Sequence, residues 1–413
     1  MRNFTSKLIG EVGLRILSSS FIFLLAHKIG AAQFGLYSTA VAFATLFVIL
    51  VDLGTNAIVT REIARDIPHR SRILKTSNFL KILAAASVII LIHVVSYASS
   101  FARENQKLVD SIGVIVIVYS LMDHAAALLA GRNELGWEAF LKISCRAVVI
   151  GTGIGVLFVK PSLLAVTMSM AAASGVAIVM GTWILRSRFG EFGAAVDAEA
   201  LRKLVRSSLP LLGFTSFWMF YDNQDILLLH HFQIANRDIG LYWSASKIID
   251  VLRVFPVLLM GAFFPTLARL AATRESYLQT SRTLLGYAVL AIPAVVGSVY
   301  WAAPFLETLF YGPQFLEAAV LLRLLLPAFA ATFLNHIFMQ MLITKDLEMK
   351  LLSASLVACV SNFILNWFLI PRYGPPGVCY ALIISEWIFL SFQIRWIVVT
   401  VPGLFNPFRR RFG

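Results

Sequence analysis

Charged residues are scarce in this chain. They make up 14% of its 413 residues, whereas hydrophobic residues make up 59%, and the mean hydropathy is +0.80. A soluble globule of 45.7 kDa needs far more polar surface than this composition supplies. The scarcity excludes a soluble protein and predicts an integral membrane protein.

Cysteines and acidic motifs are also rare. The three cysteines, Cys145, Cys359 and Cys379, show no paired spacing, which argues against a disulfide framework or a metal site. No Asp-x-Asp occurs in the sequence, and the segments expected outside the membrane are short. A membrane glycosyltransferase or polysaccharide polymerase, which needs catalytic groups in a sizeable loop, is therefore only an alternative.

The apolar residues lie in twelve runs that are long enough to cross a bilayer, for which a helix needs about 20 mainly apolar residues. The expected spans are 8–28, 36–58, 78–99, 111–131, 143–160, 162–185, 208–231, 239–264, 283–303, 319–343, 350–370 and 377–399. The predicted fold class is all-α and integral to the membrane, with Pro256 kinking the eighth helix.

Lysine and arginine set the expected orientation. With both termini cytoplasmic, 22 of these residues fall in cytoplasmic segments and 6 in external loops. The bias alternates loop by loop, as the positive-inside rule requires. Contact of the basic loops with anionic lipid accounts for most of the net charge of +13 without nucleic acid as a partner.

The two halves of the chain resemble each other. The segment Gly35-Leu36-Tyr37-Ser38-Thr39-Ala40 aligns without gaps with Gly240-Leu241-Tyr242-Trp243-Ser244-Ala245. The offset is about half of the chain, so we expect a duplicated bundle. Its parts are an N-terminal six-helix lobe over 1–186, a cytoplasmic linker over 187–207 and a C-terminal six-helix lobe over 208–413.

The linker carries a pattern of its own. Leu201, Leu204 and Val205 follow helical spacing after Asp197. This pattern predicts an amphipathic helix on the inner leaflet, with Asp197 as its N-cap. The alternative is a short solvated connection.

Short motifs are spread along nearly the whole chain. In the first half they are Gly30, Phe34-Gly35-Leu36-Tyr37, Asp52-Leu53-Gly54 and Arg61-Glu62-Ile63-Ala64. In the second half they are Ser208-Leu209-Pro210-Leu211, Asp225-Ile226-Leu227-Leu228, Gly240-Leu241-Tyr242, Ala245-Ser246-Lys247-Ile248, Pro265, Ala303-Pro304-Phe305-Leu306, Tyr311-Gly312-Pro313-Gln314-Phe315, Asn362, Asn366 and Ile370-Pro371-Arg372-Tyr373-Gly374. Their order and spacing resemble the polysaccharide-unit flippases of the multidrug/oligosaccharidyl-lipid/polysaccharide exporter superfamily.

The resemblance implies two pseudo-symmetric six-helix lobes that form a V around a central cavity. It implies a transporter, not an enzyme, without a cofactor. The substrate would be an undecaprenyl-pyrophosphate-linked oligosaccharide, moved by alternating access from the inner to the outer leaflet for O-antigen, capsule or exopolysaccharide assembly. The setting would be the bacterial plasma (inner) membrane, with membrane lipid, a polysaccharide polymerase and glycosyltransferases as partners.

Such a substrate needs cations at membrane depth, because burying unpaired charge in hydrocarbon costs many kcal/mol. Lys247, Asp250 and Arg253 lie three residues apart and so share one face of the eighth helix. We expect Lys247 and Arg253 to bind the diphosphate, and Arg15 to add a cation from the other lobe. The basic residues at membrane depth are Arg15, Lys81, Arg146, Lys247, Arg253, Arg323 and Arg395.

Acids near these cations are expected to set their charge or to carry a coupling proton. Asp222 falls at a depth similar to that of Lys247, so a pair between the seventh and eighth helices is feasible. Asp225 and Asp250 are the other two candidates. The alternative reading is an ion pair that only locks the helices together, and Arg15 has its own alternative partner in Glu11, four residues earlier.

Polar residues also form stripes on the tenth and eleventh helices. The candidates for sugar contacts are Asn335, Gln340, Asn362 and Asn366, because residues three or four apart share a helix face. Hydrogen bonding between helices explains these stripes equally well.

A multidrug or cation antiporter of the same superfamily is the alternative function. Such a carrier is expected to hold an acid centrally in its first lobe. The acid on the first helix is Glu11, near the cytoplasmic end, and the deep cations favour an anionic substrate.

The charge bias yields a test of orientation. In a background that lacks Cys145, Cys359 and Cys379, a cysteine at position 105 should react with a reagent added from outside, and a cysteine at position 197 should not. Labelling of single-cysteine variants in intact cells measures this. The reverse pattern would invert the proposed direction of transport.

Overall fold

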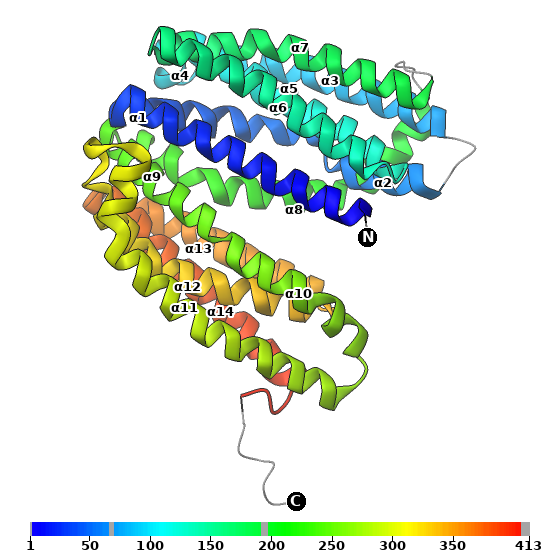
Figure 1. Ribbon diagram of the computed structural model, residues 1–413, viewed down its shortest axis with the longest axis vertical. Coiled ribbons are helices and arrows are strands. Elements are labelled where there is room, and N and C mark those ends of the chain that lie inside the picture. Colours follow the sequence, from blue (N-terminus) through cyan, green and yellow to red (C-terminus); the bar gives the residue numbers. More distant parts are fainter. Residues whose placement is uncertain (1, 66–69, 191–196, 406–413) are drawn as a thin grey trace, which may run out of the picture. The chain divides into compact units, whose positions relative to one another are not determined.

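The computed structural model describes residues 2–65, 70–190 and 197–405, and among them it contains helices and turns but no strand (Figure 1). The basic residues 409–411, which enter the orientation argument, lie outside this part. The fold is all-α, as the sequence predicts. Contacts divide the chain into two compact units, Met1–Leu227 and Leu228–Gly413.

The first unit contains seven helices and most of an eighth. They are α1 (Arg2–Asp52), α2 (Thr55–Arg65), α3 (Arg70–Ser96), α4 (Ser100–Glu104), α5 (Gln106–Gly131), α6 (Leu135–Val159), α7 (Leu163–Phe189) and α8 (Ala198–His231). The boundary between the units falls inside α8, whereas the sequence places it in the connection 187–207. The six-helix lobe boundaries stay a prediction.

The second unit holds the end of α8 and the remaining helices. These are α9 (Asn236–Leu252), α10 (Val254–Leu270), α11 (Arg274–Tyr311), the 3₁₀ turn η1 (Pro313–Phe315), α12 (Ala318–Ile343), α13 (Glu348–Tyr373) and α14 (Pro375–Thr400).

Each expected span falls on helical residues, although 36–58 runs from α1 into α2 and 239–264 covers both α9 and α10. Ten helical stretches in the described part are long and apolar enough to cross a membrane. One of them, Gly13–Arg65, holds two expected spans, 8–28 and 36–58, because α1 leaves the helical conformation at Gly30, where φ is 84°. Glycine tolerates this left-handed conformation because it lacks a Cβ atom. The expected span 208–231 lies in α8.

The break at Gly30 supports the internal repeat. Gly30 aligns with Ala235, which is the N-cap of α9. The second expected helix of each half thus begins at the same aligned position. The later helices also recur in order, so that α5, α6 and α7 correspond to α12, α13 and α14.

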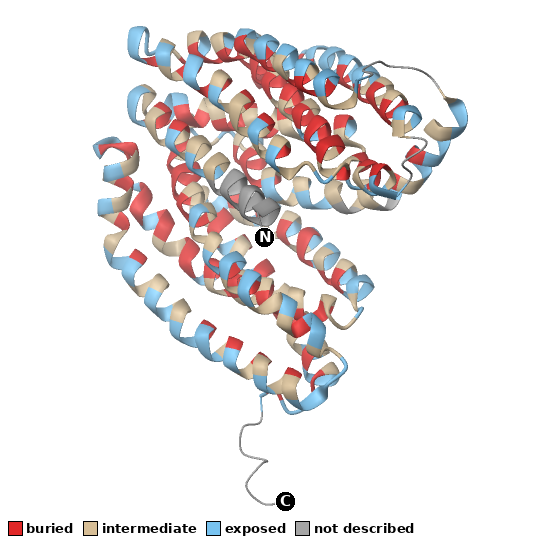
Figure 2. Cartoon of the chain, turned by 45° about the vertical axis from the view of Figure 1, so that its right-hand side comes forward, coloured by how far each residue is buried: buried red, intermediate tan, exposed pale blue. Residues whose placement is uncertain are grey.

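One helix forms the centre of each unit. In the first unit α5 packs against α1, α2, α3, α6 and α7, and in the second α12 packs against α9, α10, α11, α13 and α14. Figure 2 shows that many helices carry buried positions on one side and exposed positions on the other. The exposed sides hold large apolar residues, such as Val179, Leu290 and Trp301. Apolar surface on this scale suits lipid and not water.

The three cysteines, Cys145, Cys359 and Cys379, are buried, and none of them forms a disulfide within the described residues.

The predicted amphipathic helix is the first part of α8 and continues without a break into the seventh span. Asp197 caps it as expected, because its Oδ1 accepts a hydrogen bond from the Ala200 N–H at 3.0 Å. Arg72 of α3 holds the same carboxylate through Nε and through Nη2, the latter at 2.8 Å from Oδ1. The Arg72 hydrogen bonds lower the pKa of Asp197 to about 2, so the carboxylate stays charged at physiological pH. The start of α8 is thereby fixed to the start of α3.

The closest approach between α2 and α5 occurs at Gly131. A Cβ atom there would lie 2.9 Å from the Thr60 carbonyl oxygen and 2.9 Å from the Ile63 Cβ. The Thr60 hydroxyl also donates to the Ala127 carbonyl at 3.0 Å, which holds the two helices together. A side chain at position 131 must therefore push the helices apart.

We predict that Gly131→Ala destabilises the protein by about 1–3 kcal/mol, the usual cost of overpacking. Gly151→Ala on α6 is the matched control, because a Cβ there meets no atom within 4 Å. It should be neutral or slightly stabilising. Thermal unfolding followed by fluorescence-detected size exclusion compares the two, and equal midpoints would contradict the close approach.

Candidate functional site

The spanning segment of α9 and α10 is interrupted at Arg253. The helix α9 ends at Leu252, and α10 begins at Val254. Pro256 explains the break, because it has no N–H to donate to the carbonyl of Leu252 one turn earlier. The interruption falls within one turn of the proline at which the sequence predicts a kink. A broken helix in a membrane leaves unpaired backbone groups, which are tolerated where other polar groups or water can reach them.

The predicted face of Lys247, Asp250 and Arg253 forms a connected charge cluster, called here the triad. The Lys247 Nζ lies 2.7 Å from Asp250 Oδ2, and the Arg253 Nη1 lies 2.9 Å from Asp250 Oδ1. The three side chains are 29 to 35% exposed, so they are partly accessible. One carboxylate between two cations leaves a net charge of +1 for an anion to neutralise.

The triad lies deep along its helix. Lys247 follows the start of α9 at Asn236 by about 16 Å at 1.5 Å per residue, which is near half of a hydrocarbon core of about 30 Å. Its ammonium group also lies over the Trp243 ring, at 5.3 Å from the centroid. Arg253 lies between the two helices, as the C-cap of α9 and the N-cap of α10.

The other predicted charged residues lie in the first unit. Asp222 and Arg15 are exposed, and Asp225 is buried, with its Oδ1 accepting from the N–H of Ile226 at 2.7 Å. The partner of Lys247 on its own helix is Asp250. The expected pair of Lys247 with Asp222, which belongs to the other unit, stays a prediction. The side chain of Glu11, the alternative partner of Arg15, lies outside the described residues.

Two of the four predicted sugar-contact residues hold helices of the second unit together. Asn335 of α12 donates to the Glu386 carboxylate of α14 at 2.8 Å. Asn362 of α13 donates to the Ser385 hydroxyl of α14 at 3.1 Å, and Asn366 donates to Asn362 one turn earlier on α13 at 3.0 Å. The alternative of interhelical hydrogen bonds thus accounts for Asn335 and Asn362, whereas the bond of Asn366 lies within its own helix.

Gln340 differs from these asparagines. It is half-buried on α12, and its side chain makes no hydrogen bond within the described structure. It keeps both its amide donors and its acceptor for a ligand.

The structure contains buried charged groups that sequence reasoning did not assign. Lys81 of α3 is 1% exposed, and its Nζ contacts the carbonyl oxygens of Val51 at 3.0 Å and Asp52 at 2.8 Å and the Asp52 carboxylate at 3.2 Å. It caps the C-terminus of α1. The sequence indicates that Lys81 lies at membrane depth. It does not indicate that the partners of Lys81 lie on another helix, α1.

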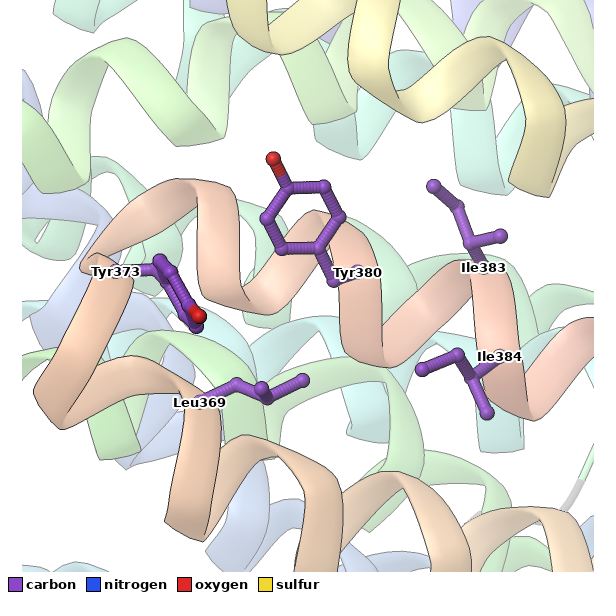
Figure 3. Close-up of a pocket in the computed structure, with 5 residues that line it drawn as sticks. All are labelled: Leu369, Tyr373, Tyr380, Ile383 and Ile384. Carbon is purple, nitrogen blue, oxygen red and sulfur yellow. The ribbon is translucent and has the colours of Figure 1, made fainter.

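A small pocket lies between α13 and α14, with a volume of about 460 Å³ (Figure 3). It is lined by Leu369, Tyr373, Tyr380, Ile383 and Ile384, and the two tyrosine rings meet edge to face at 5.9 Å. The lining contains no charged group. It suits a hydrocarbon chain better than a charged head group.

Comparison with known families identifies the family of this chain. The family model described as polysaccharide biosynthesis protein matches residues 1–271. The chain belongs to this family. The resemblance seen in the sequence is thereby confirmed.

Two relatives from Haloferax volcanii are described as flippases. The chain is 21% identical to the probable low-salt glycan biosynthesis flippase Agl15 over 384 residues, which are 90% of this chain and 77% of the relative. It is 28% identical to the probable flippase AglR over 173 residues, which are 40% of this chain and 36% of that relative.

Solved structures share the fold at lower identity. The lipid II flippase MurJ in an inward closed conformation aligns with a TM-score of 0.76 at 16% identity, covering 96% of this chain and 89% of that one. An inward-facing multidrug resistance MATE family transporter of the MOP superfamily aligns with a TM-score of 0.72 at 13% identity, covering 95% and 94%. At these identities the likeness shows the fold alone.

We predict that Asp250→Asn lowers the free energy of unfolding by about 1–3 kcal/mol, because it leaves the cations of Lys247 and Arg253 close together. This range lies between the usual contributions of exposed and of buried ion pairs. Adding Lys247→Met should recover part of this loss. Asp238→Asn, near the start of α9, is the control, because its nearest cation atom in Arg237 is 3.9 Å away and both side chains are exposed. Thermal midpoints of the purified variants measure the effect, and no recovery in the double variant would argue against coupling within the triad.

Proposed function

We propose that this protein moves a lipid-linked, negatively charged oligosaccharide from the inner to the outer leaflet by alternating access. The observation that carries the proposal is the triad, a partly accessible and net positive cluster at a break in a spanning helix. Membership of the polysaccharide biosynthesis protein family supports the substrate class.

The charge of the triad fits a reversible anion site. A transporter must release its substrate, so its site cannot bind the head group too tightly. Asp250 takes up part of the positive charge of Lys247 and Arg253 and orients both side chains through short contacts. A diphosphate that reaches the triad would meet oriented hydrogen-bond donors whose net charge is +1. An arginine without the neighbouring carboxylate would bind the substrate more tightly.

The remaining residues receive roles consistent with this proposal. Arg15 would add a cation from the first unit, and Asp222 and Asp225 would set the local charge. Gln340 is the strongest candidate for a sugar contact, since Asn335 and Asn362 already bond between helices and Asn366 bonds to Asn362. The apolar pocket between α13 and α14 is large enough for part of a hydrocarbon chain.

The family resemblance suggests a more specific function. The carrier lipid of the substrate would be undecaprenyl pyrophosphate, and the protein would lie in the bacterial inner membrane with cytoplasmic termini. It would act beside a polymerase and glycosyltransferases in O-antigen, capsule or exopolysaccharide assembly. The fold likeness to a MATE transporter keeps multidrug or cation antiport as the second candidate. A cationic drug would be repelled by the triad, whereas an anionic head group would be attracted.

We predict that Arg253→Ala abolishes surface polysaccharide while membrane levels of the protein stay near normal. Arg253→Lys should restore only part of it, because lysine lacks the two-pronged guanidinium that binds phosphate oxygens. Arg237→Ala is the matched control: it lies near the start of α9, is 47% exposed and pairs with Glu317 at 2.8 Å.

Quantifying surface polysaccharide and protein level in the same cells separates export from expression. Normal polysaccharide with Arg253→Ala would remove Arg253 from the site. Drug resistance that depends on the protein, with unchanged polysaccharide in all variants, would instead favour the antiporter.

A further inference from the structure

Arg146 of α6 is a cation at membrane depth to which the proposed function assigns no role. It follows the start of α6 at Leu135 by about 16 Å and precedes the end at Val159 by about 20 Å, at 1.5 Å per residue. A hydrocarbon core is about 30 Å thick, so Arg146 lies near the middle of the membrane. A charged group at this depth is costly and almost always faces the interior of a helix bundle or a water-filled space.

Arg146 lies on the buried face of α6. Its neighbours one turn away, Lys142 and Ile150, are half-buried and buried. The exposed rings of Phe140 and Phe158, which suit contact with lipid, lie about 120° around the helix from it. Arg146 therefore belongs to the side of α6 that packs within the first unit, against α1, α5 and α7, and not to the side that suits lipid.

Arg146 is held by an aromatic ring of the neighbouring helix α5. Its guanidinium carbon Cζ lies 3.7 Å from the centre of the Tyr119 ring. The negative face of an aromatic ring attracts a cation at this distance. The contact positions the guanidinium between α5 and α6, and it uses none of the N–H donors for a bond to an oxygen atom.

Within the described part of the chain, no oxygen atom forms an ion pair or a hydrogen bond with Arg146. The acid of its own helix, Glu138, pairs with Lys142 at 3.4 Å, so that Lys142 is neutralised and Arg146 contributes a single positive charge. Arg146 is half-buried, and its nitrogen atoms are not enclosed by the protein. Its N–H donors are therefore available to a ligand.

Arg323, a deep arginine of the second unit, has a structural role by comparison. Pro304 of α11 has no N–H, so the carbonyl of Tyr300 one turn earlier lacks its helical donor. The Arg323 Nε donates to this carbonyl at 3.0 Å, and its Cζ lies 4.9 Å from the centre of the Tyr300 ring. Arg323 thus satisfies the backbone of α11, whereas Arg146 stacks on a tyrosine and satisfies no other group.

We propose that Arg146 is a binding site in the first unit for the carboxylate of an acidic sugar in the transported oligosaccharide. A planar guanidinium binds a planar carboxylate through two parallel hydrogen bonds. The single charge of Arg146 matches the single charge of a sugar carboxylate, whereas the two cations of the triad suit a diphosphate. The inference rests on the proposed function for the oligosaccharide, but not for the anion site itself.

The site also bears on the class of substrate. A multidrug or cation antiporter is expected to hold an acid centrally in its first lobe, and α6 holds a cation near the middle of the membrane instead. The proposal narrows the substrate from any lipid-linked oligosaccharide to one that contains an acidic sugar.

Thermal unfolding of the purified full-length protein separates a binding role of Arg146 from a structural one. Arg146→Met removes a deep charge and keeps a flexible side chain, so the midpoint should stay the same or rise. Arg323→Met is the matched control and should lower the midpoint, because it leaves the Tyr300 carbonyl without a donor. A fall in Arg146→Met as large as that in Arg323→Met would overturn the proposal.

Binding of trigalacturonate, an oligosaccharide with carboxylates, tests the ligand, and the neutral maltotriose is the reference. The wild type should bind trigalacturonate more tightly than maltotriose. Arg146→Met should bind trigalacturonate at least about tenfold more weakly, the usual effect of losing a hydrogen bond between charged groups. Arg146→Lys should recover part of the loss, because lysine keeps the charge but lacks the planar fork.

The control Arg323→Met should bind trigalacturonate as the wild type does. Equal affinities of the wild type for the two sugars would contradict the proposal, and so would equal affinities of the wild type and Arg146→Met for trigalacturonate.

Inorganic pyrophosphate distinguishes a sugar carboxylate from a phosphate as the ligand of Arg146. Arg146→Met should bind pyrophosphate as the wild type does, whereas Arg253→Ala should lose this binding and keep that of trigalacturonate. Loss of pyrophosphate binding alone in Arg146→Met would overturn the assignment to a carboxylate. Trigalacturonate binding that depends on Arg146, together with pyrophosphate binding that is unaffected by Arg253→Ala, would keep the Arg146 site and remove the triad.

Discussion

Hydrocarbon solvates neither backbone hydrogen-bonding groups nor charges, and the structure follows from this constraint. Helices satisfy their own backbone groups, so the described residues form helices almost throughout. Where a helix ends or breaks at depth, a polar group is at hand. Lys81 caps the carbonyls at the end of α1, beside Leu53 and Gly54 with positive φ, and Arg253 occupies the break between α9 and α10.

The same constraint sorts the polar residues into two kinds. Some hold helices together, such as Lys81 with Asp52, Asn335 with Glu386, and Asn362 with Ser385. Others are kept at membrane depth without such a bond between helices. The triad is partly exposed and its three side chains sum to a formal charge of +1, and neither carboxyl oxygen of Glu307 is hydrogen-bonded to a described residue. Functional inference concentrates on the second kind, because ionisable groups kept at membrane depth are costly and often have a function.

Much of the fold could be predicted from local patterns. Apolar runs of spanning length gave the helices, and Asp197 was recognisable as an N-cap because capping depends on residues within one turn. The triad was recognisable for the same reason, since three-residue spacing fixes a common helix face. The repeat predicted that the second helix of each half begins at one aligned position, and Gly30 and Ala235 confirm it. The continuity of α8 was missed, because the polar linker composition obscured a helix that runs on into the apolar span.

The sequence by itself determined the membrane class, the helical fold, the duplication and the shared face of Lys247, Asp250 and Arg253, because each depends on neighbours along the chain. The tertiary structure decided which polar residues are already engaged. Asn335 and Asn362 look like ligand-binding groups until α14 supplies their partners, Glu386 and Ser385. Glu307 lies near the end of an apolar segment, where an acid is unremarkable, until packing with other helices buries its side chain completely. Hydrogen-bond partners from distant helices are set by three-dimensional packing, which no local pattern encodes.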